Sequence, residues 1–279
     1  MSLRDKIKEQ IKDLEATLKE LDTLEGKTYE VESAGSLKAR VKAKPILPKY
    51  ATGIYWLDDY MKGGFKEGSF INIAGQSFSG KSTLVLNILS NISMYNKCLF
   101  FSFEMYENLI AHKLEHLSDI QNTNLLIEQY RNDIDEVVSL IKLYASKGVK
   151  FVAIDSKMKL KVGGSKEDHQ KASLISSTLA KLCQETGVII MLINQISEAD
   201  LKDGRFSLKG SGDQMYDSDV VFFITVKDDE KNGTTTRTIF CSKDRINGKK
   251  WKHIMPEITI NQNVKEVVYD EKKIEMQRV

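Results

Sequence analysis

Residues 75–83 carry the side chains of this chain that are best suited to chemistry. They read Gly-Gln-Ser-Phe-Ser-Gly-Lys-Ser-Thr and match the P-loop pattern G-x-x-x-x-G-K-[ST] at every fixed position. In this pattern glycines let backbone N–H groups turn toward phosphate oxygens, the lysine supplies positive charge, and the hydroxyl can bind Mg²⁺. The sequence therefore predicts that ATP and Mg²⁺ are held by Gly75, Gln76, Ser77, Phe78, Ser79, Gly80, Lys81, Ser82 and Thr83.

The residues on both sides of this loop favour the same interpretation. Residues 69–74 form a short apolar run typical of a β-strand, and residues 83–92 have the apolar spacing of an α-helix. The phosphates would then lie at a helix N-terminus, where the helix dipole stabilises negative charge. The alternative is a glycine turn that precedes a helix by chance, and the match at every fixed position argues against it.

Three polar residues come directly after apolar, strand-like runs. They are Glu104, Asp155 and Gln195. In an open α/β sheet, ligands bind beyond the carboxyl ends of the strands, so these side chains should meet the phosphates. Asp155 suits Mg²⁺ binding through a water molecule, Glu104 suits the base that orients the attacking water, and Gln195 suits a γ-phosphate sensor. Each could also be an ordinary polar residue at a strand end, but the P-loop favours the functional interpretation of all three together.

The pattern of elements from residue 50 onward predicts the fold class. Apolar strands are expected at 97–103, 150–155 and 188–193. Helical spacing separates them at 107–117, 134–145 and 168–185. Strand-like segments with Asn-Gly turns follow at 220–225, 234–241, 251–260 and 265–269. We therefore expect an α/β fold with a mostly parallel central sheet that ends in antiparallel hairpins.

The N-terminal part has a different character. Residues 1–25 place leucines and isoleucines three or four positions apart among charges, which predicts an amphipathic linker helix. Its apolar stripe should dock either on the protein's own core or on a neighbouring subunit. Residues 26–49 lack strong periodicity and contain prolines, so a flexible connector is expected there. Residues 50–279 are then expected to form the ATPase domain.

Composition sets limits on the location and partners of the protein. The chain has 279 residues, of which 41% are hydrophobic and 29% charged, and its net charge is +2. No apolar run approaches the ~18 residues that cross a bilayer, and the N-terminus does not resemble a signal peptide. The three cysteines lack metal or disulfide spacing, so we expect a cytoplasmic protein without a membrane partner. A DNA site would have to be a local basic patch.

Several motifs in a fixed order resemble the RecA-like ATPase domain of DnaB-type replicative helicases, within the RecA/DnaB/KaiC superfamily. Beside the P-loop, they occupy residues 52–60, 101–105, 194–195, 208–220 and 242–248. The last of these reads Ser-Lys-Asp-Arg-Ile-Asn-Gly and is the most diagnostic. The resemblance covers residues 50–258. It implies a RecA-like fold, ATP hydrolysis coupled to single-stranded DNA, and a homo-oligomer in the form of a hexameric ring or a filament.

The resemblance also implies roles for particular residues. Lys243 and Arg245 match the basic pair that reaches the ATP site of a neighbouring subunit, where an arginine finger stabilises transition-state charge. Their alternative is solvated charge beside a turn. One departure from the family is Ser156, which stands where an aromatic residue usually follows the strand-end aspartate.

Two segments are candidates for DNA binding. The first matches the family's pore loop and contains Lys209, Gly210 and Gly212, although the family usually has an arginine and an acidic residue at the first two of these positions. The second follows Asp155 and is a basic loop with Lys157, Lys159 and Lys161. Basic residues on a glycine-containing loop suit contacts with the backbone of a single strand. The alternative for the second segment is a solvated surface loop.

The sequence leaves three functions open. The first is a DnaB-type ring helicase that translocates on single-stranded DNA. The second is a RecA/KaiC-like recombination or annealing-mediator ATPase that binds single-stranded DNA without unwinding. The third is a scaffold that uses ATP only for assembly, against which the intact catalytic set argues. Replication or recombination proteins are the expected partners of the first two.

Overall fold

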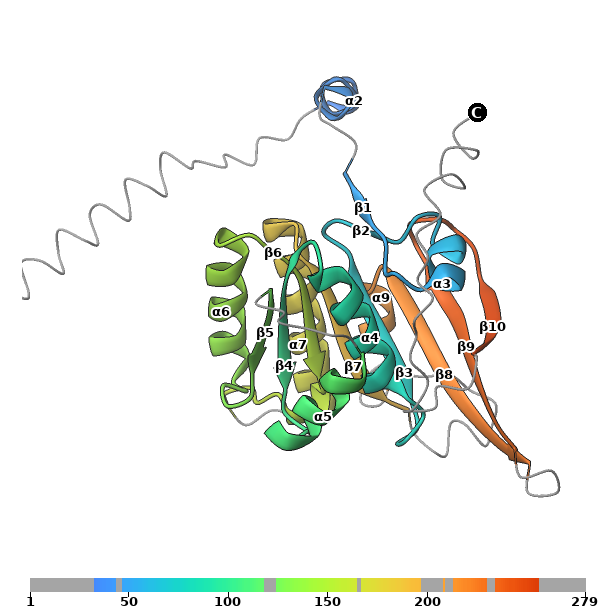
Figure 1. Cartoon of the computed structure of the whole chain (residues 1–279). Helices are drawn as coiled ribbons and strands as arrows, with labels where there is room; N and C mark the ends of the chain where they lie inside the picture. Colours follow the sequence, from blue (N-terminus) through green and yellow to red (C-terminus); the bar gives the residue numbers. More distant parts are fainter. Residues whose placement is uncertain are drawn as a thin grey trace, which may run out of the picture. The chain divides into compact units, whose positions relative to one another are not determined.

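The computed structural model (Figure 1) describes residues 33–43, 47–117, 124–164, 167–196, 208, 213–229 and 234–255. The chain divides into two compact units, Met1–Ile46 and Leu47–Val279. The predicted linker helix of residues 1–25 and the predicted strand at 265–269 lie outside the described residues.

The described part of the first unit contains one helix, α2, over Ala34–Lys42. Its N-cap is Ser33, whose hydroxyl accepts a hydrogen bond from the Ser36 amide at 3.1 Å. None of its residues is buried. The sequence predicted a flexible connector over residues 26–49, and it did not predict a helix within that range. The capping serine and the basic last turn stabilise a helix without the apolar periodicity that the prediction relied on.

The second unit is built on an eight-stranded sheet with the order β10-β9-β8-β3-β7-β6-β4-β5. The strands are β3 (Phe70–Gly75), β4 (Lys97–Ser102), β5 (Leu125–Glu128), β6 (Val149–Asp155), β7 (Ile189–Gln195), β8 (Val220–Asp229), β9 (Thr234–Asp244) and β10 (Trp251–Met255). All neighbouring strands from β8 to β5 are parallel, whereas β9 is antiparallel to both of its neighbours, β8 and β10. The predicted α/β class, with a mostly parallel sheet and antiparallel C-terminal strands, is confirmed.

Helices cover both faces of this sheet (Figure 1). They are α3 (Tyr55–Tyr60), α4 (Lys81–Ser93), α5 (Glu107–Leu117), α6 (Ile134–Ser146), α7 (Asp168–Thr186) and the short α9 (Asp213–Asp217), together with a 3₁₀ turn, η1 (Lys157–Lys159). A small antiparallel ribbon, β1 (Lys49–Tyr50) and β2 (Phe65–Lys66), lies before β3 in the chain. The helices predicted at 107–117, 134–145 and 168–185 match α5, α6 and α7.

Alternation along the strands places separate apolar clusters on the two faces of the sheet. Phe100 packs in the cluster that contains α4, whereas its neighbour Phe101 packs in the cluster that contains α6 and α7. The same alternation separates Ile73 from Phe70 on β3. Successive strand residues point to opposite faces, so strands that are apolar throughout require helices on both sides.

A chain of buried polar side chains crosses the middle of the sheet. The Asn72 amide donates to the Ser218 hydroxyl at 2.6 Å, and the Asn194 amide donates to the Asn72 side-chain oxygen. These residues join β3, β7 and the segment that leads into β8, and all three are buried. Buried polar groups that are hydrogen-bonded to one another favour a single register of the strands that carry them.

Candidate nucleotide-binding site

The P-loop connects β3 to α4, and its two fixed glycines are required for different reasons. A Cβ on Gly75 would lie 2.6 Å from the Ile224 carbonyl oxygen and from the Ser79 hydroxyl, so no side chain fits there. Gly80 is the N-cap of α4 and has φ +93°, which is left-handed backbone that glycine adopts without strain. Phe78 has φ +61° and is 97% exposed at the tip of the loop.

The Lys81 ammonium lies within the curl of the loop. It donates to the carbonyl oxygens of Gly75 at 3.0 Å and Gln76 at 2.5 Å. Burial lowers the pKa of Lys81, while the negative charges of Asp155 and Glu104 oppose this effect. The position of this cation at the N-terminus of α4 suits a phosphate ligand, whose oxygens could replace the carbonyl groups.

Sheet register brings three predicted residues to the same edge as the P-loop. Gln195 is the register partner of Gly75 across β3 and β7, and Asp155 is the partner of Ser102 across β6 and β4. The Phe103 amide donates to the Asp155 carbonyl at 2.7 Å, which ties the chain before Glu104 to the end of β6. The carboxyl ends of four adjacent strands thus carry the P-loop, Gln195, Asp155 and Glu104.

Asp155 is the side chain in this group that best fits a cation. It is 1% exposed, and among the described residues neither of its carboxylate oxygens has a hydrogen-bond partner of good geometry. Burial raises its pKa to about 6; the Ser82 side chain beside it and the Lys81 charge lower the pKa, and Glu104 raises it. A buried carboxylate beside a P-loop hydroxyl fits Mg²⁺, which Ser82 and Asp155 would hold, with Asp155 bound directly or through water. Bound Mg²⁺ would neutralise charge on the phosphates.

The raised pKa of Asp155 leads to a stability prediction. Its folded-state pKa lies above the ordinary 3.8, so the folded protein retains this proton up to about pH 6. The stability linked to this proton is complete below about pH 4 and is lost as pH rises through 6, by about 3 kcal/mol as an upper estimate. We expect Asp155→Asn to raise the Tm of the metal-free protein by roughly 5 °C at pH 8 and to have little effect at pH 4.

Thermal unfolding in EDTA at the two pH values measures this effect. Asp59→Asn, which changes an exposed carboxylate on α3, is the matched control and should leave Tm unchanged at both. Added Mg²⁺ and ADP should stabilise the unmodified protein more than the Asp155→Asn variant. An equal Tm for Asp155→Asn and the unmodified protein at pH 8 would contradict the assignment of a buried, destabilised carboxylate.

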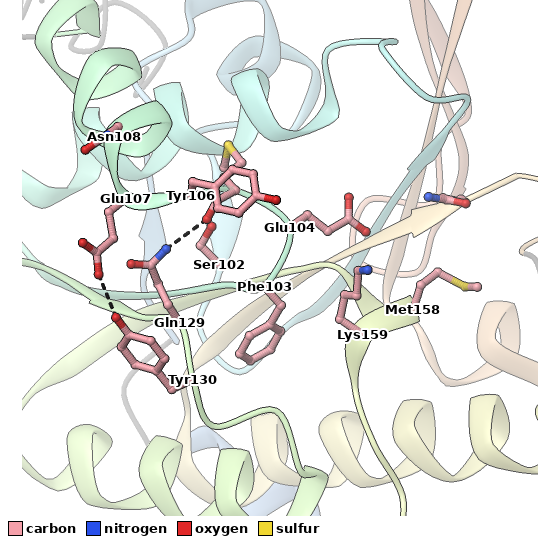
Figure 2. Close-up of a pocket in the computed structure, with 12 residues that line it drawn as sticks. Ser102, Phe103, Glu104, Tyr106, Glu107, Asn108, Gln129, Tyr130, Met158 and Lys159 are labelled. Carbon is pink, nitrogen blue, oxygen red and sulfur yellow. Dashed lines mark hydrogen bonds between the residues drawn. The ribbon is translucent and has the colours of Figure 1, made fainter.

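Glu104 lines a pocket of about 990 Å³ that lies beyond the carboxyl ends of β4, β5 and β6 (Figure 2). Gln195 and Lys159 also line this pocket. Figure 2 shows Glu104 and Lys159 on one side of it and Glu107 and Tyr130 on the other, where the Tyr130 hydroxyl donates to Glu107 at 2.7 Å. The Glu104 carboxylate accepts a hydrogen bond from the Ser156 hydroxyl. Ser156, the departure from the family pattern, thus contacts the candidate base directly.

Lys243 and Arg245 lie near the amino-terminal ends of β3 and β8, whereas their own P-loop lies at the carboxyl end of β3. The Lys243 ammonium donates to the Tyr216 carbonyl at 2.9 Å, and the Arg245 guanidinium donates to the same carbonyl at 2.7 Å and pairs with Asp219 at 3.3 Å. The Asp219 carboxylate in turn accepts from the amide of Phe70, the first residue of β3. The P-loop follows Gly75 at the other end of β3, so five residue steps, or about 17 Å of strand, separate the two ends. The fold does not bring this pair to the ATP site of its own subunit.

The predicted DNA-binding residues differ in their exposure to solvent, and some of them lie outside the described residues. Lys159 and Lys161 are exposed at η1 and just after it. Lys157 is only 5% exposed, because its place directly after buried β6 keeps it inside the fold, and its contact with DNA stays a prediction. Lys209, Gly210 and Gly212 lie outside the described residues.

Two residues near the P-loop were missed by sequence reasoning. The Lys113 ammonium on α5 lies 3.4 Å from the Thr83 hydroxyl, and its charge lowers the pKa of Asp155. Arg237 on β9 lies beside Gly80: a Cβ built on that glycine would be 3.8 Å from the Arg237 Cδ. Neither residue belongs to a local motif, because both reach the site through long-range packing.

The fold and the P-loop define a RecA-like P-loop ATPase domain. Residues 50–272 match the family model of the KaiC ATPase, and the chain belongs to this family within the RecA superfamily. No helix in the described ranges has both the length and the apolar character needed to cross a membrane.

Comparisons with individual proteins agree with this assignment. A protein of Trieres chinensis described as "Probable replicative DNA helicase" is 39% identical over 74 residues, which is 26% of this chain and 16% of that relative. DNA repair protein RadA of Aquifex aeolicus is 25% identical over 147 residues, or 53% of this chain and 33% of the relative. RadA of Escherichia coli is 25% identical over 162 residues, or 57% and 33%. The matched segments therefore span a third or less of these curated relatives.

Two solved structures share the fold. One of them, described as an ATPase domain, superposes with a TM-score of 0.66 at 20% identity, covering 79% of this chain and 92% of that one. The other is the KaiC-like protein PH0186 of Pyrococcus horikoshii, which has a TM-score of 0.61 at 19% identity, with coverages of 77% and 97%.

Proposed function

We propose that this protein is an ATP-driven motor of DnaB type that moves on single-stranded DNA, with ATP sites between the subunits of a ring. The observation that carries the proposal is the placement of Lys243 and Arg245 at the amino-terminal end of β3, at the opposite end of this strand from the P-loop. The candidate catalytic carboxylates lie at the carboxyl ends of the strands, and the candidate arginine finger lies at the amino ends. Each ATP site would therefore need the finger of a neighbouring subunit to be complete.

The chemistry assigned to each residue follows from its position. The P-loop amides and Lys81 would hold the β- and γ-phosphates, and Ser82 and Asp155 would hold Mg²⁺. Glu104 would accept the proton of the attacking water, and Gln195, paired in register with Gly75, would contact the γ-phosphate. Arg245 of the neighbouring subunit would stabilise the charge that develops on the transferred phosphoryl group.

The hydrogen bond from Ser156 to Glu104 supports coupling between DNA and hydrolysis. Ser156 directly precedes η1, which carries Lys159 into the pocket beside Glu104. A DNA phosphate bound by Lys159 would therefore act on a segment that is hydrogen-bonded to the candidate base. This arrangement offers a short physical connection between a bound strand and the attacking water.

The first test is ATP hydrolysis by the purified protein with and without single-stranded DNA at two salt concentrations, followed by unwinding of a forked duplex. The proposal expects strong stimulation by DNA that decreases as salt rises, and strand separation that requires hydrolysis. Hydrolysis that is indifferent to DNA would overturn the coupling to DNA and leave an ATPase that acts on another partner.

A second candidate function is a recombination or annealing mediator that binds single strands without unwinding them. The similarity to two DNA repair proteins favours it. The same preparations distinguish the two functions. Closed rings in electron micrographs together with unwinding support the helicase, whereas open helices and strand annealing without unwinding support the mediator.

The exposed lysines after β6 provide a prediction for DNA binding. We expect the double variant Lys159→Ala, Lys161→Ala to bind single-stranded DNA several-fold more weakly and to reduce the salt slope of binding by about 0.7 for each lost phosphate contact. Fluorescence anisotropy of a labelled oligonucleotide, measured over a salt series with ADP present, tests this.

The control for this variant is Lys181→Ala, which removes an exposed lysine from α7. It should leave both the affinity and the salt slope unchanged. If the double variant keeps the salt slope of the unmodified protein, these lysines do not contact DNA phosphates.

A further inference from the structure

Arg237 is a cationic residue beside the P-loop to which the catalytic scheme above assigns no role. Its Cδ and Nε lie 3.8 and 3.9 Å from the position that a Cβ on Gly80 would take, so the side chain passes directly over the start of α4. Arg237 is partly buried, and its register partner on β8 is Val226. It belongs to the same subunit as the loop that it contacts, unlike the candidate finger Arg245.

The face of the sheet that carries Arg237 is the nucleotide face. Ile239, the next residue on the same side of β9, packs in the apolar cluster that contains α4, together with Ile224 of β8. Phe240 and Phe223 belong to the cluster on the opposite face. Because alternate residues share a face, Arg237 points toward the side on which α4 and the P-loop lie.

Strands β8 and β9 also continue past the P-loop. The last residue of β3, Gly75, pairs with Ile224, yet β8 continues to Asp229 and remains paired with β9 along this extension. Figure 1 shows these two strands projecting beyond the end of β3. Arg237 lies on this extension, which places it beside the P-loop.

The order of the strands places the γ-phosphate and the nucleoside of a bound nucleotide on different sides of β3. Gln195, Asp155 and Glu104 come from β7, β6 and the end of β4, which all lie on one side of β3. The γ-phosphate must face these residues, because the attacking water lies among them. The nucleoside end must then extend to the other side of β3, where β8 and β9 carry Arg237.

We infer that Arg237 binds the nucleoside half of the nucleotide held by its own P-loop, with its guanidinium stacked on the purine base. The amides of the loop, Lys81 and Ser82 are already assigned to the phosphates and Mg²⁺, and a planar guanidinium has the shape and weak hydration suited to an aromatic face. This inference rests on nucleotide binding at the P-loop and does not depend on DNA.

The test compares Mg-ADP with Mg-pyrophosphate in calorimetric titrations of the full chain without DNA. The two ligands share a diphosphate and differ only in the nucleoside. We expect Arg237→Ala to weaken ADP binding roughly tenfold and to leave pyrophosphate binding unchanged. Arg237→Lys should behave like the alanine variant, because lysine keeps the charge but lacks the planar face.

Lys227→Ala is the matched control, because Lys227 is an exposed cation of the same extension on the opposite face. It should bind both ligands normally, and melting curves establish that all variants fold. Equal weakening of ADP and pyrophosphate, or rescue by lysine, would overturn stacking in favour of a phosphate contact. Unchanged ADP binding by Arg237→Ala would overturn the inference altogether. Failure of the unmodified protein to bind ADP would instead refute the P-loop assignment.

Discussion

Replacing Arg245 with alanine is expected to lower the rate of ATP hydrolysis by about 10³- to 10⁵-fold, the range that arginine fingers supply, while nucleotide binding changes little. The reason is the position of the side chain. Arg245 is held at the amino-terminal edge of β3 and β8 by Asp219 and the Tyr216 carbonyl, whereas its own phosphates would lie at the carboxyl edge. Its contacts within the subunit are partly exposed, so their loss should cost little stability.

Mixing experiments separate a finger that acts on a neighbour from a residue that acts within its own subunit. Lys81→Ala removes the phosphate-binding cation and should be inactive alone, as should Arg245→Ala. Equimolar mixtures should recover part of the activity, since an intact P-loop can meet an intact finger across an interface. Lys252→Ala on β10 is an exposed basic control that should hydrolyse ATP normally. Full turnover by Arg245→Ala, or no recovery on mixing, would show that sites are not shared in this way.

Replacing Glu104 with glutamine should lower hydrolysis by about 10²- to 10⁴-fold, because the amide has nearly the same shape but cannot accept the proton of the attacking water. Glu104 is exposed in the pocket of Figure 2, and its carboxylate is positioned by the Ser156 hydroxyl. ATP should still bind and should remain uncleaved on the protein. A filter-binding assay with labelled ATP, followed by separation of ATP from ADP, measures both properties.

The matched control is Glu107→Gln, which changes a carboxylate of the same pocket that accepts a hydrogen bond from the Tyr130 hydroxyl at 2.7 Å. We expect its hydrolysis to remain within a few-fold of normal. If Glu107→Gln and Glu104→Gln lose activity equally, the pocket as a whole and not Glu104 supports hydrolysis.

Residues that belong to local patterns could be placed from the sequence, and residues that reach the site through packing could not. Gly75, Gly80 and Lys81 form one short motif, and the structure explains each by local space, backbone conformation or charge. Glu104 and Asp155 needed only the rule that parallel strands end at one edge. Arg237 is far from the P-loop in sequence, and only the pairing of β8 with β3 brings it to Gly80.

The features that the sequence did not predict have equally specific causes. The burial of Lys157 at the start of η1 could not be read from its charge. Helix α2 was missed because its capping serine, not apolar spacing, marks its start. Strand β5, over Leu125–Glu128, was not predicted because a strand of this length is too short to show alternation.

The placement of the P-loop and the candidate finger at opposite ends of β3 and β8 has a consequence for counting. If neighbours join head to tail, an open row of n subunits leaves one P-loop and one finger unmatched at its two ends and contains n − 1 complete sites. A closed ring of n subunits contains n. The fraction of bound ATP that is hydrolysed in a single turnover would therefore report whether the assembly is closed, and in an open row this fraction would rise with length toward that of the ring.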